Sequence, residues 1–178
     1  MKQNSLALLS VAILSAFIGT GANAQTDTAY VGLKLNVGAA NVAELGHMSG
    51  AGGWFAFGDK HKTLSWLYFR GEVELGYTVY SELTAYQFMA NFYGNFGPQS
   101  WPVIPYIGVG LGGGLFVVTN AAHSDDSSPG MTGALYAGVV VPFLKSWEAD
   151  AGIKYTASTA MVGTIRETGM MASVRYLF

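Results

Sequence analysis

Residues 67–78 read Leu-Tyr-Phe-Arg-Gly-Glu-Val-Glu-Leu-Gly-Tyr-Thr, and two kinds of side chain alternate along them. The odd-numbered positions are apolar or glycine, whereas the even-numbered positions include the charged residues Arg70, Glu72 and Glu74. Successive side chains of a β-strand point to opposite faces of the sheet. This period of two therefore predicts a strand with one apolar face and one charged face.

Seven further segments alternate in the same way. In the weakest of them, apolar residues from Trp54 to Phe57 fall on both faces, so its register is ambiguous. Eight strands can close into an antiparallel transmembrane β-barrel, which leaves no unpaired edge in lipid. We therefore predict an all-β fold of this kind. The seven segments are residues 31–38, 51–58, 87–93, 106–112, 131–143, 147–155 and 170–178.

The composition excludes several classes of protein. Of 178 residues, 51% are apolar and 11% are charged, whereas soluble domains have roughly 25% charged residues. Beyond the N-terminus there is no apolar run of about 18 residues, which excludes a helical membrane protein. The absence of Cys excludes disulfides, thiolate metal sites and cysteine nucleophiles. A net charge of -2 gives no electrostatic reason to expect a nucleic-acid partner.

The N-terminal residues have the three parts of a secretory signal peptide. Lys2 is the basic residue, residues 6–18 are a short apolar core, and Ala22-Asn23-Ala24 is the small-x-small cleavage site. The core is too short to span a bilayer, which takes about 20 residues. We expect residues 1–24 to be removed and residues 25–178 to form one barrel domain.

A soluble barrel of the lipocalin type would place the apolar face inside, and alternation alone does not distinguish it from a membrane barrel. The low charge and the aromatic residues near strand ends favour the membrane barrel, because such rings lie at the level of the lipid headgroups. These aromatic residues are Tyr77, Trp101, Trp147, Tyr155 and Tyr176.

The connections are expected to differ in length between the two ends of the barrel, as in outer-membrane proteins. Short periplasmic turns are expected at residues 58–62, 97–102 and 144–146. On the other side we expect longer loops at residues 39–50 and 116–130, and brief ones at residues 79–83 and 157–163.

The charged face is expected to line the interior, where four basic and four acidic residues sum to zero. An ion-selective channel usually has an excess of one sign, whereas balanced charges can pair in the narrow interior that eight strands enclose. A plugged, structural interior is therefore favoured over a small-solute pore. The predicted network consists of Lys34, Arg70, Glu72, Glu74, Glu148, Asp150, Lys154 and Arg175.

The sequence does not favour an enzyme, a metal site or a cofactor. Glu72 and Glu74 lie two residues apart in a barrel wall near Arg70, which favours buried ion pairs over acid–base catalysis. The polar run at residues 123–129, which begins at His123, is typical of a solvated loop. The three His residues are far apart, with His61 expected on the opposite side from the other two, so no metal site is predicted.

Four motifs carry a resemblance to a known family. They are residues 70–77 (Arg-Gly-Glu-Val-Glu-Leu-Gly-Tyr), 90–96 (Ala-Asn-Phe-Tyr-Gly-Asn-Phe), 105–112 (Pro-Tyr-Ile-Gly-Val-Gly-Leu-Gly) and 173–178 (Ser-Val-Arg-Tyr-Leu-Phe). In these the chain resembles the small outer-membrane β-barrels, which include the Opa-type surface antigens, the Ail and OmpX group and the N-terminal barrel of OmpA-type proteins.

The resemblance implies insertion into the bacterial outer membrane by the barrel-assembly machinery, with Tyr176 and Phe178 in the C-terminal assembly signal. It also implies a structural or surface-recognition role, such as adhesion or host interaction through extracellular loops. We expect a monomer surrounded by outer-membrane lipid and lipopolysaccharide.

A lipid-modifying enzyme is the alternative, because some barrels of this size are lipid A deacylases or acyltransferases. The spacing of His47-Met48-Ser49 resembles the deacylase motif. In that family, however, the pair lies on a late strand and is followed by a fixed Asn and a downstream Glu, whereas His47 is expected in the first loop. We therefore expect a protein without enzymatic activity.

Overall fold

The computed structural model describes residues 28–43, 45–118, 127–160 and 163–178, in which every regular element is a β-strand. No helix in these ranges is long and apolar enough to cross a membrane. The predicted signal peptide, residues 1–24, lies outside the described residues. The strands are β1 (Thr28–Val42), β2 (Gly46–Leu64), β3 (Leu67–Tyr80), β4 (Leu83–Phe96), β5 (Ile104–Val118), β6 (Ser127–Leu144), β7 (Trp147–Ala160) and β8 (Gly163–Leu177).

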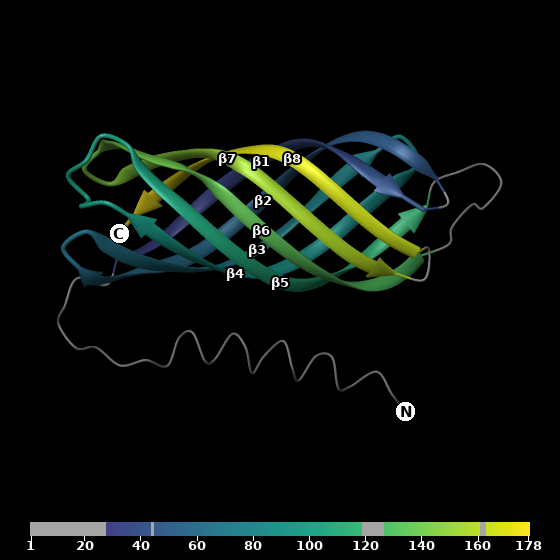
Figure 1. The fold of residues 1–178 in the computed structure, drawn as a ribbon, viewed down its shortest axis with the longest axis horizontal. Helices are drawn as coiled ribbons and strands as arrows, with labels where there is room; N and C mark the ends of the chain where they lie inside the picture. Colours follow the sequence, from purple (N-terminus) through teal and green to yellow (C-terminus); the bar gives the residue numbers. More distant parts are fainter. Residues whose placement is uncertain (1–27, 44, 119–126, 161–162) are drawn as a thin grey trace, which may run out of the picture.

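The eight strands close into one antiparallel barrel (Figure 1), as predicted. Each strand pairs with the next along the chain, and β1 pairs with β8 to complete the circle. The strands are staggered relative to one another. Starting at His47 on β2 and moving from each residue to its cross-strand partner, through β1, β8, β7, β6, β5, β4 and β3, leads back to β2 at Phe57. The start and the end of this circuit are ten residues apart. This stagger tilts the strands by about 40° from the barrel axis.

Charged and apolar side chains occupy opposite faces of the barrel wall. Lys34 and Arg70 point inward and are at most 3% exposed, whereas Leu35, Leu111 and Met131 on the outer wall are 68% to 74% exposed. A soluble barrel would bury its apolar face, so the lipocalin arrangement is excluded. An apolar outer wall around a polar interior is the arrangement that a lipid bilayer requires.

Exposed aromatic side chains form two bands on the outer wall. We call the end that holds Thr28 and Phe178 the terminal end, and the opposite end the hairpin end (Figure 1). Near the terminal end the rings of Trp147 and Tyr176 contact each other at a centroid distance of 5.1 Å. Nearer the hairpin end are Tyr77, Tyr86 and Tyr155, while Trp66 and Trp101 complete the terminal band. Two such bands with an apolar zone between them are typical of transmembrane barrels.

The turn predicted at residues 58–62 is wrong. β2 continues through this segment to Leu64, with Lys60 inside the barrel and His61 outside it, and the turn comes at residues 65–66. A tilted strand needs more residues to cross a bilayer than the apolar part of its sequence suggests. The polar composition of this segment is typical of a turn, but its side chains still alternate in and out as in a strand.

The long loop predicted at residues 39–50 is wrong for the same reason. β1 extends to Val42 and β2 begins at Gly46, so the connection is only residues 43–45. His47 therefore lies on a strand and not in a loop. Of the other long loop, residues 119–126 lie outside the described part of the chain.

The sequence leaves the register of β2 ambiguous, and the space available inside the barrel determines it. Trp54 points inward, whereas Phe55 and Phe57 point outward. Gly76 on β3 is paired with Trp54, and a Cβ atom at Gly76 would overlap the indole ring. The bare backbone of Gly76 therefore allows the bulky side chain of Trp54 to face the interior.

Candidate functional site

The centre of the interior holds one lysine between two carboxylates. Lys34 on β1 forms ion pairs with both Glu72 and Glu74, which point inward from β3 because they are two residues apart. The hydroxyl of Tyr30 donates to Glu72 at 2.9 Å, and the hydroxyl of Tyr93 lies 3.2 Å from Glu72 and 3.3 Å from Glu74. Both carboxylates are thus occupied by donors within the barrel.

Nearer the terminal end, two arginines converge on Asp150 of β7. A guanidinium nitrogen of Arg175 is 2.7 Å from the Asp150 carboxylate, and a nitrogen of Arg70 is 3.6 Å from it. The guanidinium of Arg70 also lies 4.1 Å from the ring centre of Tyr93 and 5.2 Å from that of Tyr106. Stacking on two aromatic faces offsets part of the cost of burying this charge.

The interior charge set is larger than the eight residues proposed from the sequence. Lys60 is buried and pairs with Glu148, which also lies 3.5 Å from Arg175. Glu167 on β8 is buried and accepts hydrogen bonds from Asn36 at 3.0 Å and Thr156 at 3.2 Å. Lys60 and Glu167 each lie an even number of residues from the other inward-facing residues of their strands. The alternation of side chains would therefore identify them if the strand ends were known.

Lys154 is buried without a carboxylate within 4.0 Å among the described residues. Its ammonium group lies 4.2 Å from the ring centre of Trp54, whose indole nitrogen donates to Asn36 at 3.1 Å. The expected ion pair of Lys154 is therefore replaced by a cation–π contact. With Lys60 and Glu167 included, the interior of the described part still holds equal numbers of basic and acidic residues.

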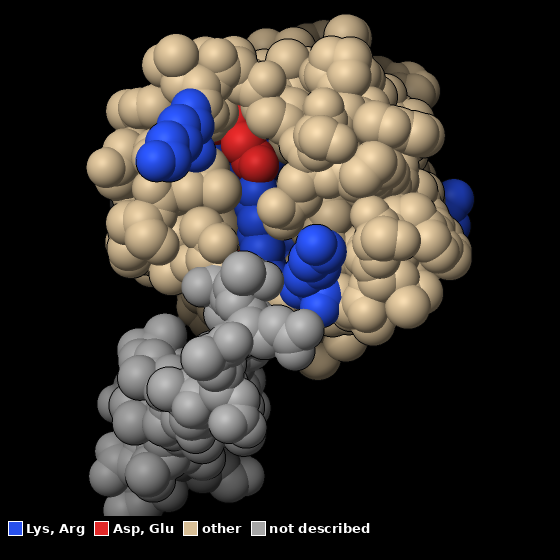
Figure 2. Space-filling view, turned by 90° about the vertical axis from the view of Figure 1, so that its left-hand side faces the viewer, with Lys and Arg blue, Asp and Glu red and all other residues tan. Residues whose placement is uncertain are grey.

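The two ends of the interior differ in chemistry. At the hairpin end, apolar side chains pack together inside the barrel; they are Ala40, Val42, Met48, Tyr80, Leu83, Ala85, Phe116, Val118 and Ile165. At the terminal end there is a hollow of about 520 Å³ that Lys60 and Glu148 help to line. Figure 2 views this end, and acidic and basic atoms are visible within it.

Several buried polar atoms between this hollow and the central lysine have no hydrogen-bond partner among the described residues. They include the Nε atoms of Arg70 and Arg175 and the hydroxyls of Tyr68 and Tyr106. Buried polar groups are normally satisfied by protein or by ordered water. We therefore expect water to enter this half of the interior from the terminal end.

His47 and Ser49 do not form a catalytic arrangement with the other described residues. His47 and Ser49 are exposed on the outer face of β2, with Met48 between them inside the barrel. In the described part of the chain, neither has a hydrogen bond or ion pair with an acidic side chain. His61 contacts Asp59 at 2.9 Å on the outer wall. His123 lies outside the described residues.

The described residues contain no group of three or more His, Cys, Asp or Glu side chains arranged to hold a metal ion.

Tyr176 and Phe178, predicted to form the assembly signal, are exposed on the outer wall with their ring centres 6.4 Å apart.

Several solved structures resemble this barrel. No family model and no curated protein matches the sequence. Among solved structures, Neisserial surface protein A (NspA) is 24% identical over 86% of this chain and 100% of its own, with a TM-score of 0.66. The outer membrane enzyme PagL is 15% identical over 80% of this chain and 97% of its own, with a TM-score of 0.58. Ail, the attachment invasion locus protein of Yersinia pestis, is 12% identical over 85% and 100%, with a TM-score of 0.57.

These proteins share the architecture but include both an enzyme and surface proteins, so the likeness extends to the fold and not to an activity. The membrane environment in which they fold also suits the apolar outer wall and the aromatic bands of this barrel. We expect the terminal end, which carries the turns predicted to be periplasmic at residues 97–102 and 144–146, to face the periplasm, and the hairpin end to face outward. The chain therefore has the fold of the small outer-membrane β-barrel family, and its place is the bacterial outer membrane.

Proposed function

We propose that the protein is a plugged, non-enzymatic barrel with a structural role in the outer membrane. We also propose that it binds external partners at its hairpin end. The observation that carries this proposal is the Lys34–Glu72–Glu74 cluster across the middle of the interior. The cavity beside Lys34, Glu74, Trp54 and Lys154 has a volume of only about 10 Å³. That is about the space of one water molecule, which is too small for a solute path.

A second barrier supports the same proposal. The apolar side chains at the hairpin end, such as Met48, Leu83 and Phe116, offer no hydrogen bonds to a passing solute or ion. A hydrated ion would have to lose its water there without receiving substitute ligands. The interior charges are also balanced, so they supply no selectivity for one sign of ion.

Planar-bilayer recording tests the plug. Purified wild-type protein should give no stable single-channel steps, whereas a porin in the same bilayer should give its usual steps. Reproducible current from the wild type, with a selectivity that changes in Glu72→Gln, would contradict the plug and favour the small-solute pore.

A surface-recognition role is the finer part of the proposal. It is supported by likeness to Ail, described as an attachment invasion locus protein, and by the polar sequence of residues 123–126, which lie between β5 and β6 in the chain. Replacing residues 121–126 with Gly and Ser should reduce adherence of expressing cells to host cells while the barrel still resists unfolding in unheated detergent gels. Unchanged adherence would contradict the recognition role, and only the structural role would then remain.

The enzymatic alternative receives less support from the geometry. A Ser nucleophile needs a base within hydrogen-bond reach and a group that orients that base. His47 and Ser49 share an exposed face, but no acid of the described residues orients the imidazole.

A further inference from the structure

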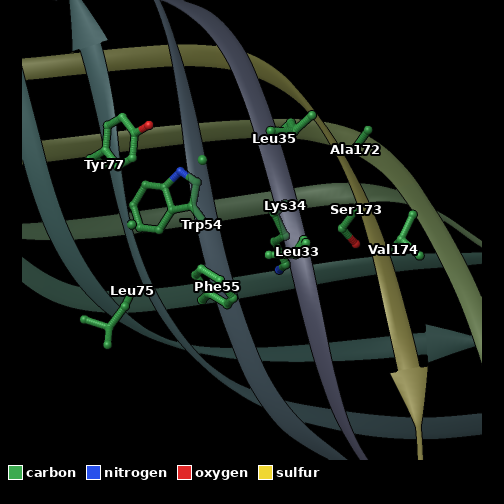
Figure 3. Close-up of a pocket in the computed structure, with 12 residues that line it drawn as sticks. Leu33, Lys34, Leu35, Trp54, Phe55, Leu75, Tyr77, Ala172, Ser173 and Val174 are labelled. Carbon is green, nitrogen blue, oxygen red and sulfur yellow. The ribbon is translucent and has the colours of Figure 1, made fainter.

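The outer wall carries an apolar groove of about 550 Å³ that crosses β1, β2, β3 and β8. Figure 3 shows Leu35, Phe55 and Leu75 among the side chains that line it. Lys34 and Ser173 also line it, but both side chains are buried and face the interior. The groove is therefore an ordinary part of the lipid-facing wall, whereas the hollow at the terminal end has a polar lining.

Polar side chains from several parts of the chain line the hollow at the terminal end, which has a volume of about 520 Å³. Lys60 reaches it from β2, and Lys145 reaches it from the turn between β6 and β7. Among the described residues that line it, Glu148 is the one acidic side chain. The uncharged polar side chains of the lining are Thr28, Gln99 and Ser146. The hollow thus offers two ammonium groups and three further groups that can donate hydrogen bonds.

The carboxylate of Glu148 is already held by cations. Lys60 forms an ion pair with it, and a guanidinium nitrogen of Arg175 lies 3.5 Å from it. Arg175 also contacts Asp150 at 2.7 Å, and a nitrogen of Arg70 lies 3.6 Å from the same carboxylate. Four basic side chains therefore accompany two acidic ones at this end; they are Lys60, Arg70, Lys145 and Arg175 against Glu148 and Asp150. The net charge of these side chains is +2.

The interior charges are neutral in sum but unevenly placed. Deeper in the barrel, two basic residues are outnumbered by three acidic ones; they are Lys34 and Lys154 against Glu72, Glu74 and Glu167. The deeper part therefore carries a net charge of -1, and the buried part at the terminal end carries +1 before the exposed Lys145 is added. In the view of the terminal end in Figure 2, acidic atoms are visible only inside the opening, while basic atoms also lie beside it. An anion from solution is thus attracted to this end.

Two buried donors next to these charges have no hydrogen-bond partner among the described residues. One is the hydroxyl of Tyr68, a residue that is 2% exposed and whose ring centre lies 5.6 Å from the ammonium group of Lys60. The other is the Nε atom of Arg175, a fully buried side chain. Water can satisfy such donors, but only an anion also compensates the excess positive charge.

The number of donors and the net charge favour a phosphate over a carboxylate or a chloride ion. A phosphate monoester carries about 1.5 to 2 negative charges at pH 7 and three acceptor oxygens, whereas a carboxylate has one charge and two oxygens. The net charge at this end is +2 for the side chains, and +1 if the main-chain carboxylate of Phe178 is counted, so a phosphate matches it. Pro142, Leu144 and Leu177 also line the hollow, which provides a place for the organic part of an ester.

We propose that the hollow at the terminal end binds a soluble phosphate, either the inorganic ion or a small phosphate monoester. Lys60 and Lys145 bind the phosphate oxygens, with the hydroxyls of Thr28 and Ser146 as further donors. Arg175 keeps the carboxylate of Glu148 engaged, so that it does not repel the ligand. The site lies away from the hairpin end and does not depend on whether the barrel is plugged.

The test is isothermal titration calorimetry of the full barrel in detergent, with inorganic phosphate as the probe and the ionic strength held constant. The wild type should bind one phosphate per barrel. Lys145→Gln should weaken binding by about fivefold or more, because a charge-assisted hydrogen bond is lost. Lys62→Gln is the matched control, since Lys62 is also an exposed lysine at the terminal end but lines a neighbouring depression and not the hollow. This variant should bind phosphate as the wild type does.

A second variant tests the buried end of the site. Replacing Lys60 with Met alone would deprive Glu148 of its ammonium partner, so Lys60→Met is combined with Glu148→Gln. The double variant should still show the heat-dependent gel migration of a folded barrel. It should bind phosphate at least about tenfold more weakly than the wild type.

Glycerol phosphate distinguishes the two forms of the ligand. Tighter binding than that of inorganic phosphate would assign the apolar part of the hollow to an ester, whereas equal binding would assign the site to the inorganic ion. No binding to the wild type, or equal losses in Lys62→Gln and Lys145→Gln, would overturn the proposal. Binding of a short-chain phosphatidic acid without binding of either soluble phosphate would also overturn it, because the ligand would then be a lipid.

Discussion

Lys34→Met is expected to lower the free energy of unfolding by about 3 to 5 kcal/mol, the cost of leaving buried charges without their partner. Lys34 is the one ammonium group within ion-pair distance of Glu72 and Glu74 among the described residues, and all three side chains are buried. Without it, two neighbouring carboxylates face each other in a confined interior. Urea unfolding in lipid vesicles, followed by tryptophan fluorescence, measures the change.

The loss of stability in Lys34→Met should come from the missing charge and not from the packing of the lysine methylene groups. Changing Glu74 to Gln in the Lys34→Met background removes one of the two opposed carboxylates and should restore part of the stability. Lys145→Met is the matched control, because Lys145 is exposed in the turn between β6 and β7. A surface lysine contributes about 0–1 kcal/mol. If Lys34→Met were no worse than Lys145→Met, the interior charges would not act as a structural network.

Changing Tyr176 to Asp, or deleting Phe178, is expected to reduce insertion into the outer membrane several-fold while export across the inner membrane continues. The reason is the predicted role of these two residues as the signal read by the assembly machinery. Both rings are exposed on the outer wall at the terminal end, where a partner can reach them before the barrel closes. Fractionation of expressing cells, with heat-dependent gel migration as the sign of folding, measures the effect.

A control separates recognition from stability. Tyr176 contacts Trp147, so Trp147→Ala removes the same ring contact without altering the end of β8. This variant should insert close to normally, even if it unfolds more easily in detergent. Similar losses of insertion in Trp147→Ala and Tyr176→Asp would indicate that packing, and not a signal, limits assembly.

The period of two in the sequence was enough to predict the number of strands and, in β1, β3, β7 and β8, which face is charged. Residues 67–78 show why: the chemical contrast between neighbours is large and the side chains of a strand alternate without exception. The ends of β2 were not predictable, because the sequence from Asp59 to Lys62 is polar on both faces and is equally typical of a turn.

The partners of the interior charges were not predictable either. Which residues face each other across the barrel depends on the stagger of the strands, which the sequence of one strand does not contain. Lys154 illustrates this, since it lies against Trp54 and not against an acid. Lys60 and Glu167 were missed because the strand ends that carry them were placed too short.

The contrast between the two ends of the interior has a consequence for the compartments that the membrane separates. Apolar side chains cover the hairpin end, while the hollow beside Lys60 and Glu148 opens at the terminal end, which we expect to face the periplasm. We expect protons and small ions to reach Arg70, Asp150 and Arg175 from the periplasmic side alone. Salt added at the terminal end should then screen these buried charges, whereas salt added at the hairpin end alone should leave them unscreened.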